Sequence, residues 1–444
     1  MERIVSLCKR RGFIFQSAEI YGGLNGVWDY GPLGTELKRN LKDYWWRVMV
    51  RERDDVVGLD GSILTHRSVL RASGHEDTFT DPMVDCRTCK ARLREDLLAE
   101  KHGAKQCPNC GGKELTEARP FNLMFQTQMG ATADETSIAY LRPETAQSIF
   151  VQFKNVLDTA RKKLPFGIAQ IGKAFRNEIN PRNYIFRSRE FEQMELEYFC
   201  AAEDGTRLLD YWLEERLKFY ENIGIPRAKL HVLTVPDADR AFYSKGTYDI
   251  EYAFPFGVQE LEGVAYRTDY DLTQHGKAIG KPLEYFDEES KQKFVPHVVE
   301  PSAGVDRTLL ALICEAYDEE TVTDEKGKSE TRIVLRLHPR MAPYKVGVFP
   351  LLKNKPELVA KAREVHALLR GEMMSFYDEA GAIGRRYRRQ DEIGTPFGVT
   401  VDFETLGEHD GALRDTVTLR HRDSMQQERV SIAALPDLLR SAIL

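Results

Sequence analysis

The chain has 444 residues, of which 30% are charged and 42% hydrophobic, and its formal net charge at pH 7 is −6. These values are typical of soluble globular proteins, and the length allows two or three domains, each with its own core. The acidic excess argues against a protein that coats nucleic acid over its whole surface, although it allows a local basic patch.

No apolar run approaches the roughly 18 residues that a membrane-spanning helix needs. The first residues, MERIVSLCKRRGF, lack the apolar core of a signal peptide. The chain contains seven cysteines, an odd number that argues against a disulfide framework. We therefore expect a cytoplasmic protein that does not bind membranes.

In chain order, the first clear element is the segment GPLGTELKRNLKDYWWRVMV, residues 31–50. Its apolar residues Leu37, Leu41, Trp45 and Val48 recur at helical spacing, which predicts an amphipathic helix. A strand is expected in ILTHRSVL, residues 63–70.

A cysteine module follows, in which Cys86, Cys89, Cys107 and Cys110 form two CxxC pairs separated by seventeen residues. This spacing is typical of a structural zinc site. Four thiolates would close the coordination sphere, so the site would have no open position for catalysis.

Residues 116 to about 335 contain several strand patterns, namely YLRPETAQ, a hairpin over 167–199, YDIEYAF and HVVEPSAG. Helices such as RLLDYWLEERLKFYENIG and RTLLALICEAY lie between or after them. Strands interrupted by helices without regular β-α-β alternation predict an antiparallel α+β domain. The polar segment 317–332 is expected to be a loop.

The hairpin carries the most informative pattern. At a period of two, Arg176 and Glu178 share a face of the first arm, and Ile171 and Phe175 take the opposite face. On the return arm one face carries Arg187, Arg189, Phe191, Gln193, Glu195 and Glu197, and Met194, Leu196 and Tyr198 lie behind it. Guanidinium groups and a flat ring suit a nucleotide. The alternative is a solvated sheet with ordinary ion pairs.

From about residue 339 a regular β–α alternation predicts a separate α/β domain. YKVGVFPLL, FGVTVDF and TVTLRHR are expected strands, and residues 356–381 an expected helix. The run RRYRRQDEIGTPFG contains a basic cluster with one aromatic ring: Arg385, Arg386, Tyr387, Arg388 and Arg389. Such a cluster suits unpaired RNA bases. The alternative is a solvated charged edge.

Several motifs together resemble one family. FRNE with RSREF, EPSAGVDR, LRPETAQ and ELEG…YRTDYDL resemble the homodimeric glycyl-tRNA synthetases, which are class II aminoacyl-tRNA synthetases. The resemblance covers nearly the whole chain. It implies an α+β fold: a catalytic domain with an antiparallel sheet flanked by helices, a zinc-ribbon-like insert and a C-terminal α/β anticodon-binding domain.

The resemblance also implies domain limits and an activity. Residues 1–85 would form the N-terminal part of the catalytic domain with a dimer-forming helix, 86–115 the zinc insert, 116–338 the ATP and glycine site, and 339–444 the anticodon-binding domain. The implied reaction attaches glycine to the 3′ end of tRNA(Gly) through a glycyl-adenylate and releases AMP and pyrophosphate. ATP, Mg²⁺ and structural Zn²⁺ are the implied cofactors, and a homodimer the implied assembly.

The family's ATP-binding residues match seven positions here: Arg176, Glu178, Arg187, Glu190, Phe191, Glu260 and Arg307. Arg176 and Arg307 match the catalytic arginines, of which Arg176 would bridge the α-phosphate and the amino-acid carboxylate. Arg187 and Arg307 would hold the γ-phosphate, Phe191 would stack on adenine, and Glu190 would accept from its exocyclic amine. Glu260 and Glu300 are the candidates for coordinating Mg²⁺.

The family's glycine site carries over as Glu144, Glu178, Glu300 and Ser302, with Arg267 as a further anion contact. Because glycine is the smallest amino acid, a tight pocket can exclude its competitors and no editing domain is required. The basic linker between the CxxC pairs could touch tRNA near its acceptor end; alternatively, zinc only staples the insert.

Two further classes of function compete with this interpretation. A sister synthetase for another amino acid is disfavoured by RPETAQ and EPS. A non-catalytic accessory subunit would be expected to lack the phosphate-binding arginines, which are all present. One departure from the class pattern is Thr65-His66, where many relatives carry Thr-Pro in the strand that builds the dimer interface.

Overall fold

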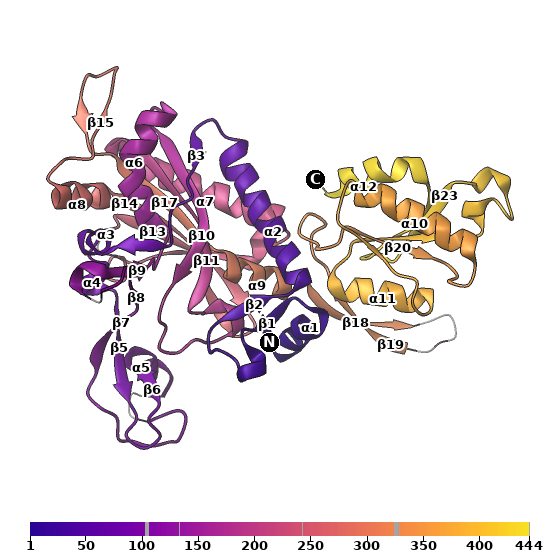
Figure 1. Cartoon of the computed structure of the whole chain (residues 1–444), viewed down its shortest axis with the longest axis horizontal. Helices are drawn as coiled ribbons and strands as arrows, with labels where there is room; N and C mark the ends of the chain where they lie inside the picture. The colour runs from indigo at the N-terminus through magenta and orange to yellow at the C-terminus, as the bar shows by residue number, and fades with distance from the viewer. Residues whose placement is uncertain (103–105, 133, 242, 324–326, 328, 444) are drawn as a thin grey trace.

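The structure is a computed structural model that describes residues 1–102, 106–132, 134–241, 243–323, 327 and 329–443. Its largest sheet has seven strands in the order β12-β13-β14-β17-β11-β10-β3, antiparallel except for the pair β10-β3 (Figure 1). Its strands are β3 Val56–Gly58, β10 Phe166–Phe175, β11 Glu190–Cys200, β12 Leu230–Thr234, β13 Gly246–Phe254, β14 Gly257–Thr268 and β17 His297–Gly304. The predicted hairpin over 167–199 is confirmed as β10-β11.

Helices cover both faces of this sheet unequally. One face packs against α1 Glu2–Arg11, α2 Pro32–Trp46, α7 Gly205–Asn222 and α9 Val305–Ala316. The opposite face is covered at one end by α6 Ala146–Ala160 and α8 Tyr270–Ile279. The uncovered remainder of that face holds the site described below.

The faces of β11 follow the predicted period of two. Met194, Leu196 and Tyr198 are buried in the larger core, as expected. The idea of one uniformly polar opposite face was wrong, because Phe199 continues that face into the second core beneath α6. The polar residues of that face, Gln193, Glu195 and Glu197, are themselves buried, because helices close over this side of the sheet.

The arginines of the hairpin also lie differently from the prediction. Arg176 follows the end of β10, and Arg187 and Arg189 precede the start of β11. They belong to the connection between the arms and not to the ladder. A connecting segment can turn its side chains toward a ligand without the alternation that a ladder imposes.

The predicted helix over 31–50 is confirmed to Trp46 and continues as a π-helical turn, Arg47–Arg51. The predicted strand over 63–70 was wrong beyond His66, since β4 spans Leu64–His66 and α3 spans Arg67–Ala72. The His66 Nδ1 accepts the backbone N–H of Ser68 at 3.1 Å and so caps α3. A side chain that satisfies a free N–H at a helix start favours helix over strand.

Strand β4 belongs to a small sheet of order β4-β9-β8, with β8 Phe125–Gln128 and β9 Ile138–Leu141. The strand predicted for YLRPETAQ therefore covers only its first two residues. Pro143 cannot donate to a ladder, and the chain enters α6 at Ala146. The short elements nearby are β1 Ile14–Gln16, β2 Trp28–Tyr30, α4 His75–Thr78, β15 Tyr285–Phe286 and β16 Lys293–Phe294.

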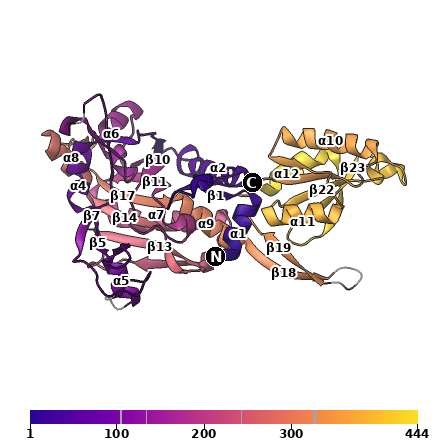
Figure 2. The same cartoon turned by 60° about the horizontal axis from the view of Figure 1, so that its bottom comes forward.

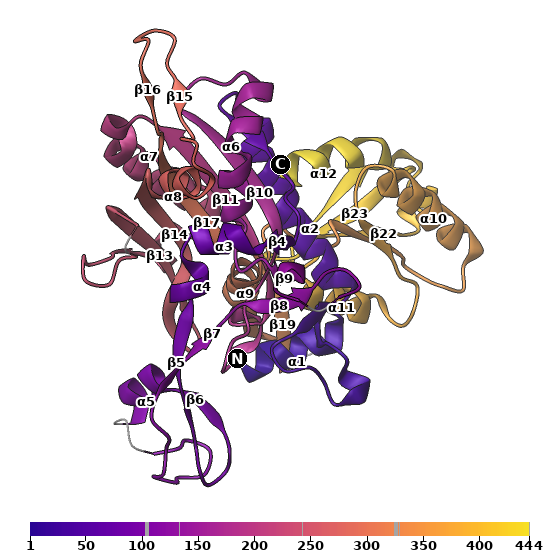
Figure 3. The same ribbon diagram turned by 60° about the vertical axis from the view of Figure 1, so that its left-hand side comes forward.

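The cysteine module projects from the body (Figure 3). It is built on a sheet of order β6-β5-β7, and helix α5 packs beside it. The bounds are β5 Thr80–Asp85, β6 Arg92–Arg94, α5 Glu95–His102 and β7 Arg119–Asn122.

The segment 317–332, expected to be a loop, is a hairpin of β18 Tyr317–Thr323 and β19 Ser329–Leu335 that reaches toward the C-terminal part (Figure 2). Its polar composition misled the prediction. Arg332 points inward, is fully buried, and binds Asp391 and Glu320. Ion pairs therefore stabilise the polar part of this hairpin.

The C-terminal sheet has the order β21-β20-β22-β23-β24, with the first three strands parallel. α10 and α12 pack on one face and α11 on the other (Figure 2). The bounds are β20 Val346–Pro350, α10 Pro356–Arg370, β21 Ser375–Tyr377, α11 Ile383–Ile393, β22 Phe397–Val401, β23 Thr416–His421, β24 Gln427–Ser431 and α12 Leu435–Ile443. The helix predicted over 356–381 was too long, since β21 lies within it. No described helix is long and apolar enough to cross a membrane.

Candidate functional site

Two adjoining cavities lie on the uncovered part of the main sheet. The first has a volume of about 170 Å³, and its lining includes Arg176, Glu178, Arg187, Phe191, Glu260 and Arg307. The second has a volume of about 280 Å³, and its lining includes Glu144, Arg176, Glu195, Arg267, Glu300 and Ser302. Arg176, Gln193, Glu260 and Ser302 line both, so the two cavities share a boundary.

Arg176 lies at that boundary. Its Nε donates to the carbonyl of Pro143 at 3.0 Å, and its guanidinium group lies 5.2 Å from the ring centroid of Phe191. These contacts fix the plane of the guanidinium group without using a carboxylate partner. A planar fork held in this way can bind a phosphate and a carboxylate that approach from the two cavities.

The other two predicted arginines of the first cavity are held by weaker, partly exposed ion pairs. Arg187 Nη1 lies 3.2 Å from Glu178, and Arg307 Nη1 lies 3.2 Å from Glu260. Arg307 is the third residue of α9 and also stacks at 4.5 Å on the ring of Phe186. A phosphate entering this cavity could compete with Glu260 for Arg307 at low cost, because that pair is partly solvated.

Glu190 and Phe191 both line a small neighbouring cavity beside Tyr30 and Lys38. Of the two, only Phe191 also lines the first cavity. Glu190 forms an ion pair with Lys173.

Four of the five predicted glycine-site residues line the second cavity: Glu144, Arg267, Glu300 and Ser302. Glu178 does not; it lies in the first cavity, bound to Arg187. Glu144 accepts from Gln147 at 3.1 Å and lies 3.3 Å from His75. Although burial alone would raise it, the charges of His75 and Arg267 hold the pKa of Glu144 well below its usual range.

Arg267 is almost completely enclosed by carboxylates and rings. Its Nη1 lies 2.9 Å from both oxygens of Glu300, and its Nε and Nη2 bind Asp271 at 2.8 and 3.0 Å. Its guanidinium group also lies 4.0 Å from the centroid of Tyr243. The expected role of Arg267 as an anion contact fits poorly with this arrangement, because its charge already serves Glu300 and Asp271.

Sequence reasoning assigned no role to Glu195, which the structure brings into the second cavity. It is 2% exposed and accepts from Ser302 Oγ at 2.7 Å and from the Thr145 hydroxyl. Burial, reinforced by the charge of Glu144, raises its pKa. The sequence signal for Glu195 was its place on the polar face of the predicted hairpin. Its burial depends on α6, which closes over that face and is seen only in the structure.

Glu260 and Glu300 both line the second cavity. Glu300 is bound to Arg267, whereas Glu260 also borders the first cavity, beside Arg307. The nearer acidic neighbour of Glu260 is Asp249, and both carboxylates lie 3.9 Å from the point where a Gly263 side chain would begin. Burial, followed by the charge of Glu260, raises the pKa of Asp249 to about 6. Two such carboxylates are a suitable pair of oxygen ligands for a divalent cation.

The four cysteines converge as predicted. The Cys86–Cys110 and Cys89–Cys107 sulfur distances are both 3.6 Å, and all four sulfurs lie within 4.8 Å of one another. Tetrahedral zinc thiolates with Zn–S bonds of about 2.3 Å require sulfur separations near 3.8 Å. The residues present therefore fit a closed structural zinc site.

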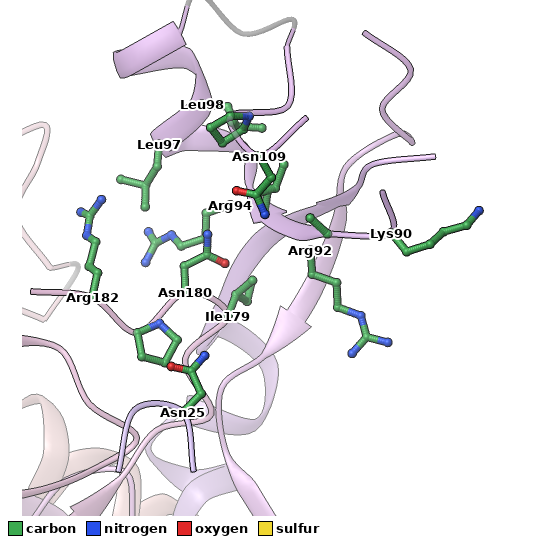
Figure 4. A pocket seen from close by; sticks show the side chains of 14 residues that line it. Asn25, Lys90, Arg92, Arg94, Leu97, Leu98, Asn109, Ile179, Asn180 and Arg182 are labelled. Atoms are coloured by element: carbon green, nitrogen blue, oxygen red, sulfur yellow. The ribbon is translucent and has the colours of Figure 1, made fainter. Parts of the chain in front are cut away.

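A cavity of about 690 Å³ lies between this insert and the connection within the β10-β11 hairpin (Figure 4). Lys90, Arg92 and Arg94 of the insert line it, together with Asn180 and Arg182 of the connection, and the side chain of Lys90 points away from the others. The apolar side chains of Leu97 and Ile179 lie among them. Residues 103–105 of the basic linker lie outside the described residues.

The basic cluster of α11 divides into buried and accessible members. Arg386 is 2% exposed and donates to the carbonyls of Pro350, Glu379 and Gly381. The prediction that it contacts RNA was therefore wrong, because its donors are consumed inside the domain. Arg385 is exposed and Tyr387 half-buried.

The remaining members keep one solvent-facing side. Arg388 binds Glu330 at 2.7 Å, Arg389 binds Asp378, and the Tyr387 hydroxyl bonds to Thr400. Arg385, Tyr387 and Arg388 line a common surface cavity of about 500 Å³. An aromatic ring with guanidinium groups at a surface cavity suits an unpaired base.

Comparison with known proteins adds independent information. The family model "tRNA synthetase class II core domain (G, H, P, S and T)" matches residues 125–317, and the model "Anticodon binding domain" matches residues 345–442. The glycine–tRNA ligase of Treponema denticola is 51% identical over 445 residues, which cover 100% of this chain and 97% of that protein. The glycine–tRNA ligase of Thermobifida fusca is 51% identical over 448 residues, covering 97% and 96%. That of Thermus thermophilus is 49% identical over 503 residues, covering 100% and 99%.

Proposed function

This chain belongs to the glycine–tRNA ligase family of class II aminoacyl-tRNA synthetases, and from that premise we propose how its residues carry out the reaction. The enzyme attaches glycine to tRNA in an ATP-dependent reaction. The observation that carries the residue assignment is the pair of adjoining cavities, one lined by three arginines and the other rich in carboxylates, with Arg176 at their boundary.

Glycine binds in the second cavity. Its ammonium group is held by Glu144, Glu195 and Glu300, and Ser302 orients Glu195 through a hydrogen bond of 2.7 Å. Buried carboxylates attract a cation strongly because little water competes for it. Bulky side chains such as Tyr243 line this cavity, and they would exclude a side chain on the substrate.

ATP binds in the first cavity, with its adenine against Phe191 and its phosphates against Arg187 and Arg307. Arg176 orients the glycine carboxylate toward the α-phosphorus, so that the carboxylate oxygen attacks and pyrophosphate leaves. Positioning and charge stabilisation are the main contributions that a protein makes to such a transfer. Mg²⁺, when bound, neutralises phosphate charge, and Asp249 with Glu260 would hold it.

Transfer then requires the 3′ end of tRNA to reach the adenylate. A basic cavity lies between the insert and residues 179–182 (Figure 4). These residues lie between Arg176 and Arg187 in the sequence. The cationic and amide groups of the cavity suit a nucleic acid backbone. We propose that the acceptor end passes there, while the surface of α11 near Arg385 and Tyr387 contacts the anticodon.

A structural zinc ion and a homodimer complete the proposal. Zinc would be held by the four cysteines of the insert. For the dimer, strand β4 and the residues flanking β4 and β8 expose apolar side chains, namely Leu64 at 45%, Ile63 at 37% and Met129 at 53%. Exposed apolar surface of this kind commonly marks a protein interface. We further propose that the chain divides into an N-terminal part of the catalytic domain at 1–85, the zinc insert at 86–115, the rest of the catalytic domain at 116–338 and the anticodon-binding domain at 339–444.

Glycine-dependent ATP–pyrophosphate exchange tests the assignment. We expect exchange with glycine and at most weak exchange with alanine or serine. R176A is expected to lose about 3 kcal/mol or more of transition-state stabilisation. R207A, which removes an exposed arginine paired with Asp204, is the matched control and should behave like wild type. Full exchange activity in both R176A and R307A would reject the assignment.

A further inference from the structure

One buried carboxylate beside the amino-acid site has no partner. Glu197 is 0% exposed, and neither of its oxygens has a hydrogen-bond partner among the described residues. Buried polar groups are nearly always hydrogen-bonded, and a buried ionised carboxylate without a donor is especially unfavourable. Glu197 therefore needs an explanation that packing alone does not supply.

Its immediate neighbours are two further acids. β11 pairs with β17 so that Glu195 lies opposite Ser302 and Tyr198 opposite Val299, which places Glu197 opposite Glu300. Carboxylate oxygens of Glu195, Glu197 and Glu300 lie within 4.8 Å of one another. Like charges directly opposite on a sheet repel, and burial in a medium of low dielectric constant strengthens the repulsion.

The hydrogen-bond donors around these acids are distributed unevenly. Glu195 accepts from Ser302, Gln193 and Thr145, and Glu300 accepts twice from Arg267. Arg267 is also shared with Asp271, so no cation is left for Glu197. Donors stabilise the ionised form of a carboxyl group, and their absence favours the protonated form. The donors therefore favour negative charge on Glu195 and Glu300 over negative charge on Glu197.

We propose that Glu197 is a positioning residue of the amino-acid site: an un-ionised carboxyl group, behind the cavity, that keeps Glu195 and Glu300 charged and directed at the substrate ammonium. This inference rests on the proposed binding of glycine in the second cavity. Glu197 does not touch glycine; it acts through the two acids that do. An un-ionised Glu197 adds no third negative charge to the buried group formed with Glu195 and Glu300. Its hydroxyl can donate a hydrogen bond, which an apolar side chain could not do.

Burial raises the pKa of all three acids, that of Glu300 to about 8. Around Glu197, Glu195 lies on the same strand, Glu300 on β17, Arg267 on β14, and Asp271 on α8. Burial, followed by the charge of Glu300, raises the pKa of Glu197 well above its usual range.

Three variants of the full-length chain test the proposal through the glycine KM in ATP–pyrophosphate exchange. E197L removes the polar group and is expected to raise the glycine KM about tenfold or more, with the ATP KM and kcat changed less than about threefold. E197Q keeps the shape and neutrality, so it should restore the glycine KM to within about threefold of wild type. A role in folding alone would not separate the glycine KM from the ATP KM.

E195Q is the reference for loss of a charged ligand, with an expected rise in glycine KM of about 30-fold or more. If E197Q raised the glycine KM as much as E195Q, Glu197 would be a charged ligand and the proposal would be wrong. Wild-type kinetics in E197L, or in E197M if E197L does not fold, would equally overturn it. An unchanged glycine KM in E195Q would instead reject the glycine site itself, which keeps the two failures distinguishable.

Discussion

A single nitrogen of Arg267, Nη1, donates to both carboxylate oxygens of Glu300 at 2.9 Å, and the exposed fractions of the two residues are only 3% and 7%. The remaining nitrogens of Arg267 bind Asp271. The buried guanidinium group of Arg267 holds the carboxylates of Glu300 and Asp271 at once. It thereby orients the Glu300 carboxylate toward the amino-acid cavity.

This relationship predicts the effect of R267K. A lysine ammonium is a single point charge and cannot bridge Glu300 and Asp271 as a planar fork does. We expect the glycine KM in pyrophosphate exchange to rise about tenfold or more, with the ATP KM nearly unchanged. R207K alters an exposed pair with Asp204 and serves as the control. Equal glycine KM values for R267K and wild type would show that the bridge does not matter.

The pKa of Glu144 predicts an acid-sensitive contribution to stability. His75 and Arg267 lower this pKa in the folded protein, so the ionised group stabilises the fold above the unfolded pKa, near pH 4.5. That stability is lost as the pH falls below this value. E144Q should therefore have a lower Tm than wild type at pH 7, and the difference should shrink at about pH 3. A Tm difference that is independent of pH would contradict the assignment.

The cysteine cluster predicts that zinc is structural and separate from adenylate formation. Four thiolates leave no open coordination position. We expect C89S to lose bound zinc, measured by elemental analysis, and to raise the tRNA KM in aminoacylation while retaining glycine-dependent exchange. Cys314 is isolated in the sequence, and C314S is the control. Loss of exchange in C89S with a preserved Tm of the catalytic part would argue for a direct catalytic role.

Neighbouring arginines of α11 should respond differently to truncation. R386A removes donors to three carbonyl groups inside the C-terminal domain and is expected to lower stability by about 2 kcal/mol or more, measured by denaturant unfolding. R385A removes an exposed side chain, so it should leave stability within about 0.5 kcal/mol and weaken tRNA binding. The opposite pattern would place Arg386, and not Arg385, at the RNA surface.

Motif spacing and period-two alternation were enough to predict the β10-β11 hairpin and the four-cysteine cluster, whereas the gathering of Arg176, Arg187, Phe191 and Arg307 followed from the family resemblance. Local patterns succeed here because strand parity and short spacings act within a few residues of chain. The polar segment 317–332 failed because its strand is stabilised by ion pairs with Asp391, which lies far along the chain.

The sequence by itself determined the chemical kinds of group at the site and the strands that carry them. Only the tertiary structure decided how those groups share their charges: Arg267 with Glu300 and Asp271, Glu178 with Arg187, Arg386 with backbone carbonyls, and Glu197 with none of the described residues. The physical reason is that burial and hydrogen-bond supply depend on which elements close over a residue. Those elements come from distant parts of the chain, so no local pattern contains that information.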